Sequence, residues 1–219
     1  GVAFVGCFAH APNVDAVRWL VEEIMPLVWE TQPDLSCLIA GSDMPADLHQ
    51  QLARPGVKIL GRVERLSEVF EQARLTIAPL RFGAGLKDKV LRSMAAGLPC
   101  VGTSEALNGM QGLPAAISEA CQHDTAPGLA AAIVWMHGDE AANTSSGQTG
   151  LDNVSAFYSE ARVNALIRDI AQPALDRFRA KGKSKPVVSE VLHFAPAPSA
   201  AEARGATWAS ARERRIVFG

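Results

Sequence analysis

Short runs of apolar residues recur along the chain, and they constrain the fold more than any other feature. Each run is about four to six residues long and is apolar on both alternations, as expected for parallel strands that are covered on both faces. The predicted strands are residues 2–6, 35–40, 57–60, 75–78 and 99–102, with 115–118 as a weaker candidate. Because helical patterns fill most of the gaps, the sequence predicts an α/β fold with a doubly wound parallel sheet.

The clearest helical pattern covers residues 14–29, where apolar side chains recur at helical spacing. Asn13 is predicted to cap its amino end, and Pro26 to kink its last turn. Further helices are predicted over residues 46–53, 66–73, 87–96 and 128–137. Residues 143–150, NTSSGQTG, are typical of a loop or a helix boundary.

No strand pattern follows residue 138, and the carboxyl-terminal part of the chain has a different character. Residues 156–180 predict a long helix with a break at Pro173. The segment beyond residue 180 is basic and rich in alanine, proline and serine, a composition that favours a linker over a packed core. We therefore predict one domain over residues 1–172 and a linker or disordered basic tail over 173–219.

Composition excludes several classes of protein. A net charge of −2 gives no reason to expect a nucleic-acid partner. The four cysteines are far apart and the histidines form no ligand spacing, so free, largely buried thiols and no metal are expected. No apolar run reaches the roughly 18–20 residues of a membrane span, and no signal peptide is visible, which favours the cytoplasm. Since the chain opens directly on a strand-like run without a methionine, we expect a fragment that lacks its amino-terminal portion.

The most informative segment is APLRFGAGLKDKVLRSMAAGLP, residues 78–99. A strand is followed by the glycine loop 83–85 and then by a helix, whose first N–H groups favour an anion. Lys87 and Lys89 lie in the first turn, where cations oppose the helix dipole and call for a compensating anion. Residues two apart do not share a helix face, so one lysine is expected on the anion and the other at the rim. The Walker pattern and G-x-G-x-x-G are both absent, and no nicotinamide dinucleotide or other cofactor is predicted.

Five segments, in their order along the chain, carry a specific resemblance. They are FVGCFAHAPNVDAVRWLVEEIMPLV, PDLSCLIAGS, PGVKILGRVERL, ARLTIAPLRFGAGLKDKVLRSMAAGLPCVGT and EALNGM. Over residues 1 to about 172 the chain resembles the C-terminal donor-binding half of a bacterial group-one-type glycosyltransferase. The resemblance implies the GT-B architecture, in which two Rossmann-like domains face each other, and transfer of a sugar from a nucleotide diphosphate sugar to an acceptor.

The resemblance also implies a set of substrate-binding residues. It places the diphosphate at Gly83, Ala84 and Gly85 with Lys87 and Lys89, and Lys89 is expected to make the phosphate contact. The base and the interdomain cleft are implied at Gly61, Arg62 and Val63, at the neighbouring Gly41 and Ser42, and at His10 and Asn13 of the first loop. No catalytic residue is assigned. The expected partners are the nucleotide diphosphate sugar and a missing N-terminal acceptor domain, with an acceptor at the membrane periphery, and hence the inner membrane face, as an option.

Three positions depart from the family pattern. Ala84 and Arg92 stand where many relatives have two glutamates, and Asn108 stands where a glutamate usually precedes Gly-Met or Gly-Leu. Arg92 cannot accept hydrogen bonds from ribose hydroxyls, because a guanidinium has only donors. Arg92 and Asn108 keep one alternative open, a degenerate, non-catalytic nucleotide-binding module. A nucleotide-sugar epimerase on the same architecture is the other alternative, although the chain offers few of the acidic and histidine groups that it would need.

Overall fold

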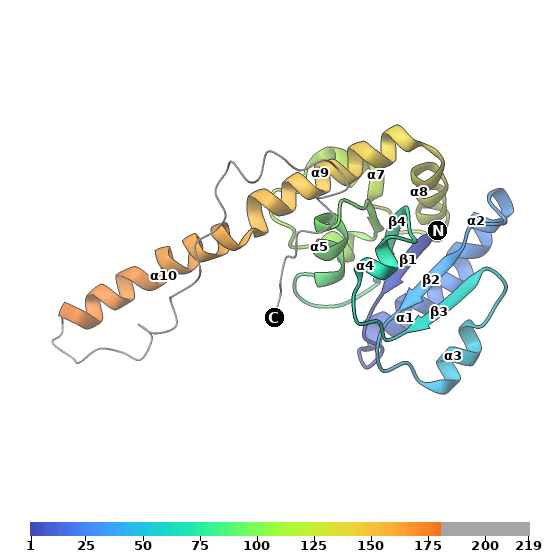
Figure 1. Cartoon of the computed structure of the whole chain (residues 1–219), viewed down its shortest axis with the longest axis horizontal. Helices are drawn as coiled ribbons and strands as arrows, with labels where there is room; N and C mark the ends of the chain where they lie inside the picture. Colours follow the sequence, from blue (N-terminus) through green and yellow to red (C-terminus); the bar gives the residue numbers. More distant parts are fainter. Residues whose placement is uncertain (181–219) are drawn as a thin grey trace. The chain divides into compact units, whose positions relative to one another are not determined.

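The computed structural model describes residues 1–180, and its centre is a five-stranded parallel sheet (Figure 1). The strand order is β3-β2-β1-β4-β5. The strands are β1 (Val2–Val5), β2 (Cys37–Ala40), β3 (Val57–Gly61), β4 (Leu75–Ala78) and β5 (Cys100–Gly102). All four strand pairs are parallel, which confirms the predicted doubly wound α/β fold.

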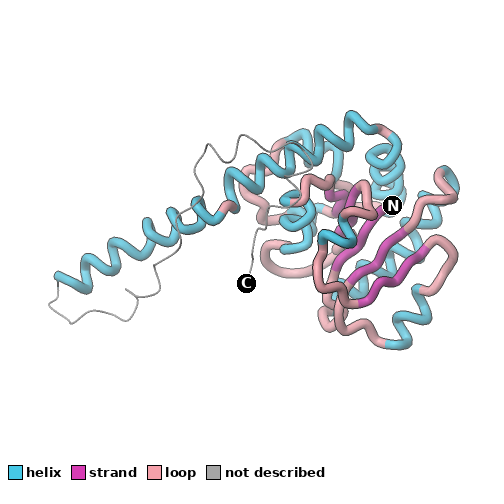
Figure 2. Tube along the Cα trace, viewed as in Figure 1, coloured by secondary structure: helices cyan, strands magenta, loops and turns pink. Residues whose placement is uncertain are grey.

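Helices alternate with the strands along the chain (Figure 2). In chain order they are α1 (Ala11–Trp19), the π-helical turn η1 (Leu20–Ile24), α2 (Met25–Thr31), α3 (Ala46–Leu52), α4 (Ser67–Phe70), α5 (Asp88–Ala95), α6 (Ser104–Leu107), α7 (Ala115–Cys121), α8 (Ala126–Gly138), α9 (Glu140–Tyr158) and α10 (Glu160–Ala180). Helices α5, α7 and α8 pack against β5. No helix within residues 1–180 is both long and apolar enough to cross a membrane.

The chain divides after Val154: residues 1–154 form one compact unit, and a second unit begins at Ser155. The first contains the whole sheet, whereas the sequence places the end of this domain at residue 172. Of the predicted tail, residues 181–219 lie outside the described part of the chain, so the linker stays a prediction.

The strands are apolar on both alternations because they are covered on both faces. Every residue of β2, β4 and β5 is buried, whereas the edge strand β3 is only partly covered. Cys37, Cys100 and Cys121 are buried as predicted, and burial raises the pKa of Cys37 to about 12. The core also holds a polar pair, Thr76 and Ser93, whose hydroxyl oxygens lie 2.6 Å apart.

The predicted helix 14–29 is present as the continuous stretch α1, η1 and α2, which extends beyond the prediction at both ends and finishes at Thr31. It begins at Ala11, and its N-cap residue is His10 rather than Asn13. Asn13 lies inside the first turn, where its side-chain amide donates to the Cys7 carbonyl at 2.8 Å. The prediction of Asn13 as a cap was therefore wrong: Pro12 lies in the first turn of a helix that starts at Ala11, and the Asn13 oxygen that a cap would use accepts from Lys89 instead.

A π-helical turn, η1, lies just ahead of Pro26, for which the sequence predicts a kink. A proline has no N–H and conflicts with the carbonyl four residues earlier. The chain widens ahead of it, so that the Met25 N–H donates to the carbonyl of Leu20, five residues back. The Val21 carbonyl, which Met25 would bond in an α-helix, instead accepts from Nη1 of Arg54 at 3.4 Å.

Three further expectations were wrong. Residues 115–118 belong to α7 and form no strand, because a four-residue apolar run has no distinguishable period and Pro114 favours a helix start. Residues 143–150 lie within α9, where the small residues allow close packing: a Cβ on Gly147 would lie 2.3 Å from the Gly97 carbonyl oxygen. Pro173 lies inside α10, since a proline removes one hydrogen bond without necessarily ending a helix.

Candidate functional site

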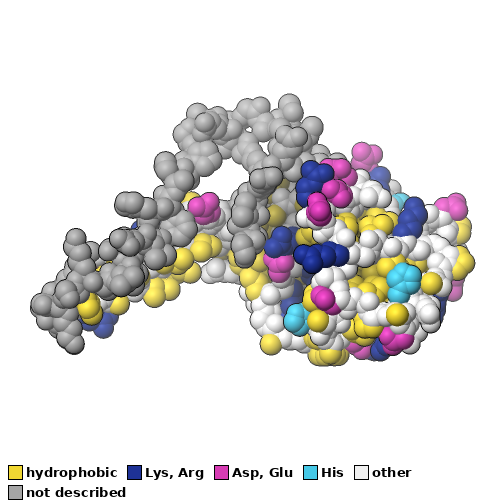
Figure 3. Space-filling view, turned by 60° about the horizontal axis from the view of Figure 1, so that its bottom comes forward, with side chains coloured by type: hydrophobic (Ala, Val, Ile, Leu, Met, Phe, Trp, Pro, Cys, Tyr) yellow, Lys and Arg dark blue, Asp and Glu magenta, His cyan; other side chains and the backbone are white. Residues whose placement is uncertain are grey.

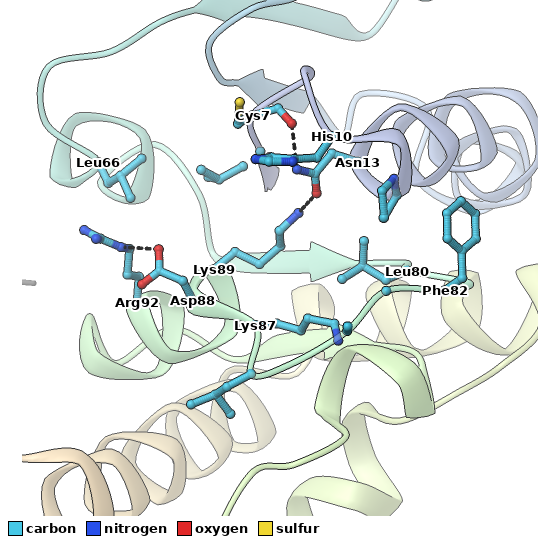
Figure 4. A pocket seen from close by; sticks show the side chains of 16 residues that line it. Cys7, His10, Asn13, Leu66, Leu80, Phe82, Lys87, Asp88, Lys89 and Arg92 are labelled. Atoms are coloured by element: carbon cyan, nitrogen blue, oxygen red, sulfur yellow. Dashed lines mark hydrogen bonds and ion pairs between the residues drawn. The ribbon is translucent and has the colours of Figure 1, made fainter. Parts of the chain in front are cut away.

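A cavity, called the main cavity below, opens where the strand order reverses. From β1 the chain continues to β2 and β3 on one side, while β4 and β5 lie on the other. At such a switch point the loops after the two central strands diverge and leave a crevice at their carboxyl ends. Here a cavity of about 600 Å³ lies between the loop after β1, the first turn of α1, and residues 80–89 after β4 (Figure 4).

Lys89 extends from the first turn of α5 toward the loop after β1 (Figure 4). Its Nζ donates to Oδ1 of Asn13 and lies 4.5 Å from the centre of the Phe4 ring. Burial lowers the pKa of Lys89 to about 8. Within residues 1–180 no carboxylate forms an ion pair with this ammonium, so its charge remains available to a ligand of the cavity.

Lys87 is held by the protein itself. It is the N-cap residue of α5, and its side chain is only 9% exposed. Its Nζ lies 2.9 Å from Oε1 of Glu105 and 2.7 Å from the carbonyl oxygen of Gly85. Lys87 thus ties the glycine loop to α6, rather than extending to the rim as expected.

The glycine loop has the backbone that its sequence predicts. Gly83 and Gly85 have φ angles of +148° and +71°, which side chains rarely allow. No side chain caps α5, so its first N–H groups are not used by a cap. Phe82 and Leu86, which flank the loop and line the cavity, are 46% and 43% exposed.

The two arginines near the loop are both engaged. Arg92, which lines the cavity, donates to Asp88 at 2.6 Å. Arg81 donates twice to the Asp15 carboxylate, at 2.9 and 2.5 Å, and its guanidinium lies 5.2 Å from the Trp19 ring centre. On the face shown in Figure 3, lysine and arginine side chains lie in small groups near carboxylates and form no single basic patch.

The remaining predicted site residues lie along the same edge of the sheet. A hollow of about 440 Å³ at the ends of β2 and β3 is lined by Gly41, Ser42, Gly61 and Arg62. A third hollow, of about 370 Å³, adds Val63 and shares Cys7 and Leu66 with the main cavity. His10, Asn13, Gly83 and Ala84 line the main cavity itself, and Gly85 contributes the carbonyl bound by Lys87.

Sequence reasoning did not single out Phe4, and it interpreted Glu105 as a solvated loop glutamate, whereas Glu105 forms an ion pair with Lys87. Phe4 reads only as a core residue of a strand, and no local pattern links Glu105 to a lysine 18 positions earlier. Among residues 1–180, no three histidine, cysteine, aspartate or glutamate side chains are arranged to hold a metal ion.

Solved structures with the same fold include several glycosyltransferases. A mutant of S. aureus TarM, crystallised with fondaparinux, alpha-GlcNAc-glycerol and UDP, is 13% identical, with a TM-score of 0.59 over 72% of this chain and 32% of that one. HepE from Anabaena, in complex with UDP and glucose, is 13% identical, with a TM-score of 0.58 over 78% of this chain and 47% of that one. The C-terminal domain of the glycosyl transferase LpcC from Francisella tularensis is 14% identical, with a TM-score of 0.54 over 73% and 85%.

These likenesses confirm the predicted Rossmann-like half of a GT-B architecture. The chain spans about a third of TarM and about half of HepE. No curated protein sequence matches it significantly. The family model for glycosyl transferases group 1 matches residues 1–139, which include the whole sheet and the main cavity. The chain therefore belongs to the glycosyl transferases group 1 family.

Proposed function

We propose that this chain is the donor-binding half of a glycosyltransferase that moves a sugar from a nucleotide diphosphate sugar to an acceptor. The observation that carries the proposal is the partly buried Lys89 ammonium, which faces a cavity beside the glycine loop and has no carboxylate partner in an ion pair among the described residues. An anionic group at the start of α5 would satisfy both this charge and the first N–H groups of the helix. Family membership and the UDP in the TarM and HepE crystals support a nucleoside diphosphate as that group.

The geometry suits departure of a diphosphate. Negative charge grows on the leaving group as the bond to the sugar breaks, and donors that are already in place stabilise it. Lys89 and the backbone N–H groups at the start of α5 would supply these donors, while Lys87 holds the loop in shape. The hollows at the ends of β2 and β3, lined by Gly41, Ser42 and residues 61–63, are proposed to take the nucleoside.

A second half is part of the proposal. Because TarM and HepE are two to three times as long as the matched region, we propose that an N-terminal acceptor domain completes the site. The acceptor at the membrane periphery and the inner-face location remain predictions that no observation on the described residues favours.

The non-catalytic module remains a second candidate because of Arg92. Its guanidinium lines the cavity where many relatives have a glutamate, and it is bound to Asp88. A module of this kind would bind nucleotide without turnover, so assaying the longer protein for transfer separates the two candidates. The epimerase alternative is not favoured, since the family is one of glycosyltransferases.

Calorimetry tests the donor site directly. The 219-residue chain is titrated with UDP, GDP, ADP and dTDP, and we expect at least one to bind. Lys89→Met removes one charge-assisted hydrogen bond, of about 1.5–3 kcal/mol, and should weaken binding by roughly ten- to a hundredfold. Lys58→Met, which removes an exposed lysine from β3 outside the described cavities, is the matched control and should leave affinity unchanged. Failure of all four nucleotides to bind would contradict the proposal.

A further inference from the structure

The Asn13 side chain joins the two halves of the candidate donor site. Its Nδ2 donates to the carbonyl oxygen of Cys7 at 2.8 Å, and its Oδ1 accepts from Nζ of Lys89, 76 positions later in the chain (Figure 4). The chemistry of the partners fixes the orientation of the amide. A carbonyl can only accept and an ammonium can only donate, so neither amide atom can exchange places with the other.

Room for this amide comes from a missing side chain. A Cβ on Gly6 would lie 3.0 Å from Cγ of Asn13 and 3.2 Å from the edge of the Phe4 ring. Gly6 does not have a left-handed backbone conformation, so its φ angle does not require a glycine. A glycine is needed here because a larger residue would crowd the Asn13 amide. The end of β1 thus supplies the Cys7 carbonyl that anchors Asn13, the glycine that admits it, and the aromatic ring beneath the ammonium.

The two lysines of the GAGLKDK segment are bound in opposite ways. Lys87 forms an ion pair with Glu105, which neutralises its charge inside the protein. Lys89 meets an uncharged amide oxygen and an aromatic face, which hold a cation in place without neutralising it. A carboxylate at position 13 would bind the ammonium more strongly, but it would also compete with any anionic ligand.

We propose that Asn13 is a positioning residue: its amide, anchored on Cys7, aims the Lys89 ammonium into the cavity and leaves the charge for the diphosphate of the donor. This inference rests on the proposed function, and it assigns to Asn13 a role that acts through Lys89. A contact between Asn13 and the sugar nucleotide is not required.

The test compares two substitutions with a matched control by calorimetry, using the 219-residue chain and the panel UDP, GDP, ADP and dTDP. Asn13→Ala removes the anchor, and Asn13→Asp replaces the neutral acceptor by a charged one. We expect each to weaken binding of the diphosphate at least fivefold. Asn143→Ala is the control, because that α9 amide also bonds two backbone carbonyls, those of Arg74 and Met136, but lies outside the described cavities. It should leave the affinity within twofold of the wild-type value.

A pH profile distinguishes positioning from a merely structural role. Wild-type affinity should fall as the pH rises through about 8, where Lys89 loses its proton. Asn13→Asp should move this fall to higher pH, because a carboxylate favours the ammonium, and Asn13→Ala should move it to lower pH. The other titratable groups that share the cavity or act on Lys89 are Cys7, His10, Lys87, Asp88, Arg92 and Cys100. Lys58→Met, the control at an exposed lysine outside the described cavities, should leave the midpoint unchanged.

The outcomes separate this inference from the proposed function. If Lys89→Met weakens binding as expected while both Asn13 variants keep the wild-type affinity and pH midpoint, the positioning role is overturned and the donor site stands. If the wild-type chain binds none of the four nucleotides, both fail. Should Asn13→Ala not fold, Gly6→Ala displaces the same amide while keeping its hydrogen-bonding groups. It should weaken binding severalfold, and an unchanged affinity would overturn the inference.

Discussion

At the scale of single residues, the burial of Lys89 should lower the free energy of unfolding at neutral pH. Its folded pKa, about 8, lies below the ordinary value of 10.5, so the folded state binds fewer protons between these two pH values. Stability therefore rises with pH across this window, and the penalty for burying the charge is present in full below pH 8. Each pKa unit corresponds to about 1.4 kcal/mol, which makes the penalty on the order of a few kcal/mol.

Lys89→Met should therefore raise the free energy of unfolding at pH 7, by about 1–3 kcal/mol after allowance for the lost contact with Asn13. The advantage over the wild type should shrink as the pH rises from 8 toward 10.5. Urea unfolding at pH 7 and pH 10 measures both effects. A variant that is less stable than the wild type at pH 7 would show that the buried ammonium is better compensated than its contacts indicate.

Glu105 should matter more for stability than a surface glutamate. It is the carboxylate partner of the nearly buried Lys87 ammonium. Glu105→Gln keeps the shape but removes the charge, and we expect a loss of about 1–3 kcal/mol in the free energy of unfolding. Glu119→Gln, at an exposed position of α7, is the control and should change stability by less than about 0.5 kcal/mol. Equal urea midpoints for the two variants would refute this assignment.

The site could be predicted from the sequence where its parts are neighbours in the chain. Gly83, Gly85 and the two lysines fall within seven residues, and the strand–loop–helix order alone predicts an anion site there. The pairings that give the lysines different tasks could not be predicted in this way. Asn13 and Glu105 lie 76 and 18 positions from their partners, and only tertiary packing decides which lysine meets which group.

At the scale of elements, α9 depends on glycines that a propensity argument would replace. An alanine is favoured over a glycine inside a helix by roughly 1 kcal/mol. A Cβ on Gly147 would nevertheless lie 2.3 Å from the Gly97 carbonyl oxygen, whereas a Cβ on Gly138 of α8 would meet nothing closer than 3.7 Å. Gly147→Ala should therefore lower the melting temperature and Gly138→Ala should keep or raise it. Thermal unfolding of both variants checks the sign, and a stabilised Gly147→Ala would be the contrary result.

The same helix shows why element boundaries were harder to predict than strands. Buried strands can be predicted from unbroken apolar runs, and every predicted strand except 115–118 is present in the structure. Residues 143–150 are polar and small, which in isolation indicates a loop; here they form helix because Gly147 and Gly150 admit the backbone of Gly97 and the Met94 side chain. The π-helical turn ahead of Pro26 could not be predicted from local sequence either. The Val21 carbonyl accepts a hydrogen bond from Arg54, which lies 33 positions later in the chain.

At the scale of the whole molecule, all cavity-lining residues belong to the first compact unit. A chain of residues 1–158, which ends with α9, should therefore keep the sheet and the nucleoside diphosphate affinity within about threefold. Circular dichroism follows the fold and calorimetry follows the binding, with the 219-residue chain as reference. A truncated chain that folds but no longer binds would mean that residues beyond 158 take part in the site.

The strand order also bears on the sequence in which the strands pair during folding. The contacts of β1 with β2 join Val2 to Cys37, but those with β4 join Val2 to Leu75, so the second pairing closes a loop about twice as long. Doubling a loop adds only about 0.6 kcal/mol of closure entropy, yet it favours the β1–β2–β3 half as the earlier folding unit. The main cavity lies between these two parts of the sheet, and Asn13 and Lys89 meet across it. The candidate donor pocket is therefore complete only when both parts are packed together, and a ligand that contacts both sides would hold them together.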